Sequence, residues 1–300
     1  GEYVRWFFDV PCPTTDIPAN FVLTTVDQAV FRAQGELRGP VHINCMFREP
    51  LFEKVGNGFK PFPTELKHWQ NSRAPYTSYF RSGDTYQKER YVSPAIAEIA
   101  GKIRGVKRGV IAVGKLASSA EQKSVLTLSE KLNWPVFADV TSGLRLGNPH
   151  KNVIHYFDQI LSVGTGFKPV PTGIIHLGGR MTSKRWYDYI EAAKPAHYIM
   201  VLNHPLRNDP LHGVTLRVQA CIDDFCGALA KEITQGKANL FFPSLQKMNK
   251  KVDQVIEECF GREARLSEAA AARLVTQYIP VNDGLFLASS LPVRHVDMYA

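Results

Sequence analysis

The chain has 300 residues, of which 44% are hydrophobic and 21% charged, and its formal net charge at pH 7 is +8. This composition is typical of a globular protein with room for two cores and excludes a disordered chain. No apolar run is long enough to span a membrane, and the basic residues form no nucleic-acid recognition motif. The charge fits either an evenly solvated basic surface or a basic cleft for anionic small molecules.

The first residues and the cysteines indicate how the chain begins and which compartment it occupies. The first residues do not have the pattern of a signal peptide, and the chain begins at Gly1 and not at an initiating Met, so we expect it to start inside a longer protein. The number of cysteines is odd and their spacing fits no zinc site. We expect buried, reduced thiols of a cytoplasmic protein at Cys12, Cys45, Cys221, Cys226 and Cys259.

Residues 1–52 predict a helix followed by a buried strand. Thr24 or Thr25 is a suitable N-cap, and residues 41–44 form the strand. Residues 53–92, rich in Pro and Gly, predict a linker. Residues 55–64 recur with small changes as 163–172, and both copies are expected to be exposed loop insertions.

Residues 93–235 alternate between apolar strands and helices with one polar face. A helix capped by Ser118 or Ser119 follows the first of these strands. The alternation predicts an α/β fold with a doubly wound parallel sheet and right-handed crossovers. We expect its strands at 108–114, 134–140, 173–178 and 197–202, with an edge strand at 214–218.

Residues 236–300 predict two helices and then a further α/β unit. A helix with a basic face covers 239–262, and a second helix covers 267–278. An apolar strand at 284–288 then opens the next unit.

Two pairs of residues are candidates for binding anions. Lys184 and Arg185 follow a strand, two glycines and a helix cap at Thr182 or Ser183, and a helix N-terminus favours carboxylates. Ser290 and Arg294 share a face if they lie on one helix. The alternatives are a solvated basic helix start for the first pair, and a cap with a surface arginine for the second.

Polar residues beyond two strand ends are weaker candidates, because open α/β sheets bind ligands there but polar clusters also fix structure. His42 and His176 lie inside strands and are expected to be core residues. The strand-end residues are Asn44, Arg48 and Glu49 in one group, and Asp139, Ser142 and Arg145 in the other.

Four segments together resemble one enzyme family. They are residues 39–51, 139–145, 176–185 and 287–297, and their order and spacing are more specific than any one alone. The chain resembles the thiamine-diphosphate-dependent SEPHCHC synthases, which make 2-succinyl-5-enolpyruvyl-6-hydroxy-3-cyclohexene-1-carboxylate.

The resemblance implies an arrangement of domains. The end of a pyrimidine-binding domain would occupy 1–52, and a linker 53–92. A central Rossmann-like domain would occupy 93–235, a helical linker 236–266, and the start of a pyrophosphate-binding domain 267–300.

The resemblance also implies a transferase of menaquinone or phylloquinone biosynthesis. It would decarboxylate 2-oxoglutarate with thiamine diphosphate and Mg²⁺ and add the product to isochorismate, as a cytoplasmic homodimer or homotetramer. Lys184, Arg185, Ser290 and Arg294 would bind the dicarboxylate substrates. The family's activating glutamate and its diphosphate-binding segment have no counterpart here, so we expect no catalytic residue in this chain and no turnover by it alone.

Two other functions stay open. One is a different thiamine-dependent decarboxylase or synthase, and the other is a non-catalytic small-molecule-binding module. A bound nucleotide is not expected, because Gly178 and Gly179 do not complete the G-x-G-x-x-G pattern.

Overall fold

The computed structural model divides the chain into two compact units. Unit 1 comprises residues 1–79 and 205–217, and unit 2 comprises 80–204 and 218–300. The structure describes residues 3–14, 16–35, 38–48, 66–72, 74–81, 92–147, 150–162, 170–233, 238–240, 242–262, 265–280 and 283–300. Glu49 and most of the two repeated segments lie outside these ranges.

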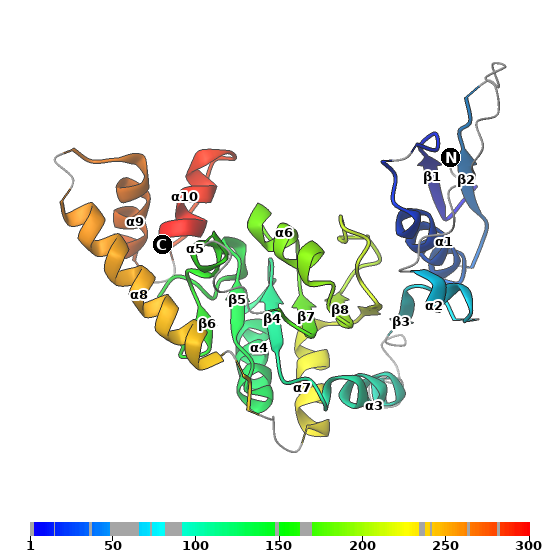
Figure 1. Cartoon of the computed structure of the whole chain (residues 1–300), viewed down its shortest axis with the longest axis horizontal. Helices are drawn as coiled ribbons and strands as arrows, with labels where there is room; N and C mark the ends of the chain where they lie inside the picture. Colours follow the sequence, from blue (N-terminus) through cyan, green and yellow to red (C-terminus); the bar gives the residue numbers. More distant parts are fainter. Residues whose placement is uncertain are drawn as a thin grey trace. The chain divides into compact units, whose positions relative to one another are not determined.

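The central feature is a seven-stranded sheet with the strand order β3-β9-β8-β7-β4-β5-β6 (Figure 1). Within unit 2, the neighbouring strands from β8 to β6 run parallel to one another. In the pair β4–β7, for example, Ile111 lies opposite Ile175. The doubly wound parallel sheet predicted from the sequence is therefore confirmed. The strand bounds are β3 (Ser78–Arg81), β4 (Gly109–Val113), β5 (Val136–Ala138), β6 (Val153–Ile154), β7 (Gly173–Leu177), β8 (His197–Leu202) and β9 (Leu216–Gln219).

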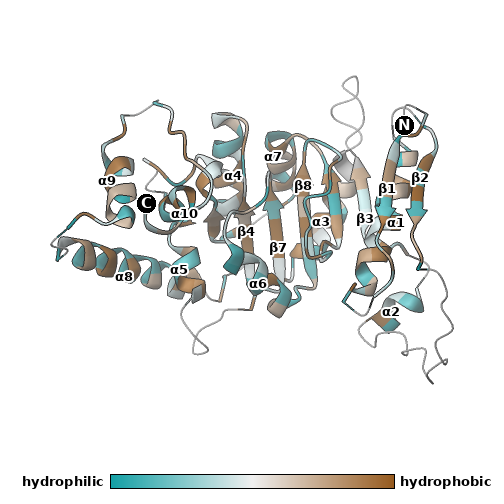
Figure 2. Ribbon diagram, turned by 90° about the horizontal axis from the view of Figure 1, so that it is seen from above, coloured by the Kyte–Doolittle hydropathy of each residue, from teal (hydrophilic) through white to brown (hydrophobic). Residues whose placement is uncertain are grey.

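The sheet of unit 2 is covered on both faces, which explains its uninterrupted apolar strands. Every residue of β4 and β7 is buried, as expected when helices pack on either side. One set of helices lies on one face of the sheet and a second set lies on the other (Figure 2). The first set is α3 (Val92–Ile103), α4 (Ser119–Leu132) and α7 (Ile222–Glu232), and the second is α5 (Phe157–Ser162) and α6 (Lys184–Ala193).

Three further helices gather beside β6 and α5. They are α8 (Phe242–Gly261), α9 (Glu268–Tyr278) and α10 (Leu291–Tyr299). The two helices predicted over 239–262 and 267–278 are confirmed. The strand predicted at 284–288 is wrong, because these residues form no strand and pair with no other segment.

The direction of winding reverses between β4 and β7. The chain runs outward from β4 through β5 and β6, and returns to build β7, β8 and β9 on the other side. The carboxyl ends of β4 and β7 therefore flank the switch point of the sheet, where open α/β folds bind ligands.

Unit 1 contains a short parallel βαβ arrangement. It consists of β1 (Trp6–Val10), α1 (Ala19–Ala33) and β2 (Val41–Cys45), followed by α2 (Lys67–Gln70). β1 was not predicted. Thr24 and Thr25 lie inside α1 and donate to the Phe21 carbonyl, so the predicted N-cap there is wrong.

The predicted burial of the 41–44 strand is also wrong. His42 and Asn44 are exposed because β2 belongs to a two-stranded sheet with only one covered face. Cys45, Cys221 and Cys259 are exposed, whereas Cys226 is buried, so the expectation of buried thiols holds for Cys226 alone among these four.

Two details near the unit boundaries differ from the expected arrangement. The segment expected to be a linker contains α2 and β3. β3 lies outside β9 in the sheet, so β9 is not an edge strand. Within the described ranges, no helix combines the length and apolar character needed to cross a membrane.

Two reciprocal side-chain hydrogen bonds fix the start of α4. The Ser118 hydroxyl accepts a hydrogen bond from the Glu121 amide at 3.2 Å, and the Glu121 carboxylate accepts one from the Ala117 amide at 2.6 Å. The Ser118 hydroxyl thus satisfies one of the free N–H groups of the first turn, and the Glu121 side chain satisfies that of the residue before the cap. Of the two serines considered, Ser118 is the cap.

We predict that Ser118→Ala lowers the free energy of unfolding by about 1 kcal/mol, because the Glu121 amide loses its acceptor. Urea unfolding followed by circular dichroism measures this change. Ser119→Ala is the matched control, since the neighbouring serine is exposed and occupies the first helical position. Equal losses for the two variants would contradict the assignment of the cap.

Candidate functional site

Polar residues meet at the carboxyl end of β5. Asp139 directly follows this strand and is fully buried. Its carboxylate accepts hydrogen bonds from the Thr141 amide at 2.9 Å and the Thr141 hydroxyl at 2.6 Å, which begins the 3₁₀ helix η2 (Val140–Ser142). Its second oxygen accepts from the Thr182 amide. Asp139 thus joins the end of β5 to the loop that follows β7.

The loop from Gly178 to Ser183 is held by buried contacts. Gly178 has a φ of +78°, and a Cβ there would lie 2.4 Å from the Lys115 carbonyl oxygen, so the position requires glycine. The His176 ring lies 2.9 Å from both the Tyr198 hydroxyl and the Gly179 carbonyl. His176 is fully buried, which confirms its prediction as a core residue.

This loop presents Lys184 and Arg185 at the N-terminus of α6. Ser183, rather than Thr182, is the cap, and its hydroxyl accepts from the Trp186 amide at 3.2 Å. The Lys184 side chain is 85% exposed and pairs with Asp188 at 2.8 Å. The Arg185 side chain is 43% exposed, and its Nη1 pairs with the buried carboxylate of Asp158.

A buried ion pair holds α10 against the end of β5. Arg145 and Asp297 approach to 3.6 Å, and both side chains are almost fully buried. The Asp297 carboxylate also accepts from the Val140 amide at 3.0 Å, and Arg145 donates to the Ala138 carbonyl at 3.3 Å. The contact therefore fixes the helix that carries Arg294.

Burial shifts the pKa values of this pair. Loss of hydration raises the pKa of Asp297 to about 7, although the nearby Arg145 guanidinium acts in the opposite direction. Burial also lowers the pKa of Arg145, against the attraction of Asp297. Ser142 completes the cluster, since its hydroxyl donates to the Asp139 carbonyl at 2.6 Å. Asp139, Ser142 and Arg145 lie together, and their contacts are those of a structural cluster.

Ser290 is the N-cap residue of α10, and Arg294 lies within this helix. Ser290 precedes the first helical residue, is exposed, and has a φ of +77°, a conformation that costs energy for a residue with a Cβ. Its hydroxyl makes no capping hydrogen bond. Arg294 is exposed and has no ion-pair partner among the residues that the structure describes.

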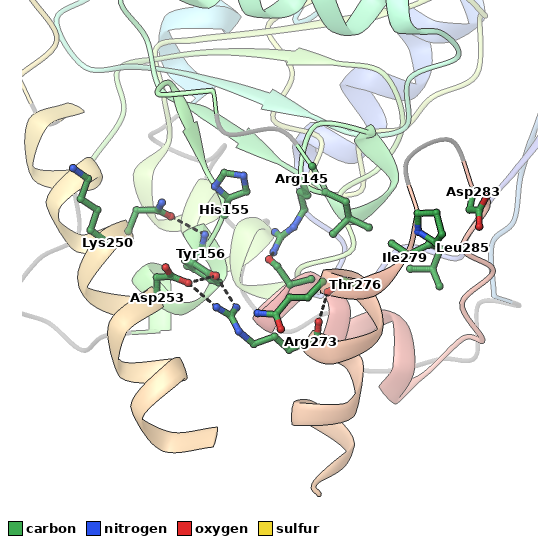
Figure 3. Close-up of a pocket in the computed structure, with 16 residues that line it drawn as sticks. Arg145, His155, Tyr156, Lys250, Asp253, Arg273, Thr276, Ile279, Asp283 and Leu285 are labelled. Atoms are coloured by element: carbon green, nitrogen blue, oxygen red, sulfur yellow. Dashed lines mark hydrogen bonds and ion pairs between the residues drawn. The ribbon is translucent and has the colours of Figure 1, made fainter. Parts of the chain in front are cut away.

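A pocket of about 920 Å³ lies between the residues that precede α5 and helices α8 and α9 (Figure 3). Arg145, His155 and Lys250 line it, and Arg273 lies on its wall. Arg273 is buried and binds Asp253 at 2.8 Å and the Tyr156 hydroxyl at 2.8 Å. This cluster was not predicted, because a single arginine in the alanine-rich helix α9 gives no local sign of its partners.

Two of the weaker candidates, Asn44 and Arg48, lie in β2 and just beyond it. Asn44 donates to the Asp9 carboxylate at 2.8 Å and is exposed, as is Arg48. Both belong to unit 1, whereas Lys184, Arg185, Ser290 and Arg294 all belong to unit 2. The four residues predicted to bind substrate thus share one unit.

The raised pKa of Asp297 predicts a pH dependence of stability. Its ordinary pKa is 3.8 and its folded pKa is about 7, so between these values the folded protein holds the proton more tightly than the unfolded chain. Stability from this group is therefore present below about pH 4 and is lost as the pH rises through about 7.

Urea unfolding at several pH values between about 4 and 7.5 tests this. Asp297→Asn removes the titration, and we expect the fall in unfolding free energy over this range to shrink by on the order of 1–3 kcal/mol. Asp224→Asn, at an exposed aspartate of α7, is expected to keep the wild-type slope. Identical slopes for wild type and Asp297→Asn would refute the prediction.

Comparison with known proteins places the chain in a family. A synthase named 2-succinyl-5-enolpyruvyl-6-hydroxy-3-cyclohexene-1-carboxylate synthase from Rubrobacter xylanophilus is 35% identical over 100% of this chain and 51% of its own length. One of the same name from Prosthecochloris aestuarii is 33% identical over 100% of the chain and 50% of its own length. Protein PHYLLO, chloroplastic, of Arabidopsis thaliana is 34% identical over 100% of the chain and 18% of its own length.

The chain thus spans about half the length of the two bacterial synthases. A family model described as "Middle domain of thiamine pyrophosphate" matches residues 60–287, which is more than half of the chain. The matched region includes the whole parallel sheet and the loop that carries Lys184 and Arg185. The chain belongs to this thiamine pyrophosphate middle-domain family.

Proposed function

We propose that this chain is the central part of a thiamine-diphosphate-dependent transferase of the SEPHCHC synthase type. The enzyme decarboxylates 2-oxoglutarate and adds the resulting four-carbon unit to isochorismate. In this proposal Lys184, Arg185, Ser290 and Arg294 bind carboxylate groups of the substrates. The similarity to the named synthases over 100% of the chain supports the reaction type.

One structural observation supports the roles of these residues. The neighbouring residues Asp139 and Val140 hold the two elements that carry them. Asp139 binds the Thr182 amide, two residues before Lys184, and the Val140 amide binds Asp297, three residues after Arg294. Both cationic elements are thereby fixed to the carboxyl end of the same strand, where α/β sheets place ligands.

The chemistry of the cations suits dicarboxylates. Arg185 uses Nη1 for Asp158, and its other N–H groups have no acceptor among the described residues, so they can receive a carboxylate. Among the described residues, Lys184 pairs with the exposed Asp188, an interaction weak enough for a substrate to replace. The helix N-terminus adds a favourable dipole.

Thiamine diphosphate and Mg²⁺ enter this proposal through the family. When bound, the cofactor supplies the electron sink for decarboxylation. Among the described residues, the group of potential metal ligands is Cys221, Asp223 and Asp224, exposed at the start of α7. This set offers two carboxylates together with a thiol, which Mg²⁺ does not favour as a ligand, so no described residue is assigned to the cofactor or the metal.

The switch point of the sheet does not favour a nucleotide. A pocket of about 210 Å³ lies there, lined by Lys115, Gly178 and Gly179. The Glu121 carboxylate, which also lines it, caps the N-terminus of α4 and places a negative charge where a diphosphate would bind. The observation speaks against an FAD- or ADP-binding relative as the alternative.

We predict that Arg294→Ala raises KM for one of the two dicarboxylates by roughly 10- to 100-fold, because a charge-assisted hydrogen bond is lost. SEPHCHC formation is measured with thiamine diphosphate and Mg²⁺ on the full-length product of the coding sequence that contains this chain. Arg262→Ala is the matched control, since this exposed arginine just beyond α8 makes a weak surface pair with Glu258 at 4.0 Å.

The proposal fails if the wild-type protein forms no product from 2-oxoglutarate and isochorismate. If product forms and Arg294→Ala leaves KM unchanged for both substrates, the reaction stands and the role of Arg294 is wrong.

A further inference from the structure

The buried carboxylate of Asp158 contacts Ser183 and Arg185, where the loop after β7 leads into α6. It lies in the first turn of α5 and is 3% exposed. One carboxylate oxygen accepts from the Ser183 hydroxyl and the other from Nη1 of Arg185. The adjacent Phe157 is fully buried and stacks on Phe137 of β5, with ring centroids 5.2 Å apart. The carboxylate is therefore held on a rigid element.

The two cations at the start of α6 differ in how they are held. Lys184 pairs with Asp188, but both side chains are more than half exposed, so the pair is screened by water. Arg185 pairs with a carboxylate that is only 4% exposed, where the attraction is less screened. Arg185 is thus the cation whose direction the protein fixes.

We infer that Asp158 is a positioning residue that aims Arg185 at the carboxylate of a substrate. Asp158 binds Nη1 of the guanidinium and leaves its other N–H groups available. A dicarboxylate would therefore bind an arginine whose side-chain rotamer is already fixed. Pre-ordering of this kind strengthens binding because the ordering entropy is not lost again when the ligand arrives. This inference rests on the proposed role of Arg185 in substrate binding.

Other contacts of the loop do not involve Asp158. Asp139 binds the Thr182 amide, the Tyr187 hydroxyl lies 3.1 Å from the Met181 amide, and His176 contacts the Gly179 carbonyl. These contacts remain when Asp158 loses its charge. Asparagine at 158 can still accept a hydrogen bond from Ser183, so Asp158→Asn releases Arg185 and keeps the loop.

A double-mutant cycle tests the inference on the full-length product of the coding sequence. We expect Asp158→Asn to raise KM for the substrate that Arg185 binds roughly tenfold, with kcat within about twofold. In an Arg185→Ala background, Asp158→Asn should change KM no further. The matched control is Glu191→Gln, which makes the same carboxylate-to-amide change at an exposed position of α6, the helix that carries Arg185. It should leave KM unchanged.

Equal effects of Asp158→Asn in the presence and absence of Arg185 would overturn the inference, because a merely structural role acts in both backgrounds. A crystal structure of Asp158→Asn without substrate provides a second readout, in which Arg185 should leave its present position. An unmoved Arg185 would also overturn the inference. If Arg185→Ala alone changes KM for neither substrate, the proposed binding role of Arg185 fails, and the crystal structure still decides whether Asp158 positions it.

Discussion

The buried carboxylate of Asp139 is the contact on which the arrangement of the candidate site depends. An isolated buried charge is costly, and Asp139 offsets this cost with hydrogen bonds from Thr141 and from the Thr182 amide. These bonds begin η2 and tie down the loop after β7. The amide of Val140, the residue after Asp139, donates a hydrogen bond to the Asp297 carboxylate. One strand end thus orders both segments that carry the proposed substrate-binding cations.

The site combines rigid supports with exposed functional groups. Asp139, Asp158 and Asp297 are buried and hydrogen-bonded, whereas Lys184, Ser290 and Arg294 are exposed. This division is expected of a binding site, where the binding groups must be accessible to the ligand and supporting residues must restrict their conformations. The strained backbone of Ser290, with a φ of +77°, fits the same pattern, since such conformations persist where surrounding structure enforces them.

Much of the architecture could be predicted because it rests on local patterns. The apolar runs at β4, β7 and β8 are strands buried on both faces, and their alternation with helices implies a parallel sheet. The helix starts at Ser118 and Ser183 follow from capping chemistry. The prediction missed β1, and it placed the strand of β2 correctly but wrongly expected it to be buried, because an aromatic strand and a half-exposed strand give no clear burial pattern.

The sequence by itself determined the fold class, the order of the main elements and the family, because apolar periodicity and motif spacing are properties of the chain. The tertiary structure decided which polar residues meet. Arg145 and Asp297 are 152 positions apart, as the numbering shows, and only the packing of α10 against η2 brings them together. Asp158, Arg273 and their partners likewise had no local signal, since a carboxylate or guanidinium in a helix gains a role only from what the fold places opposite it.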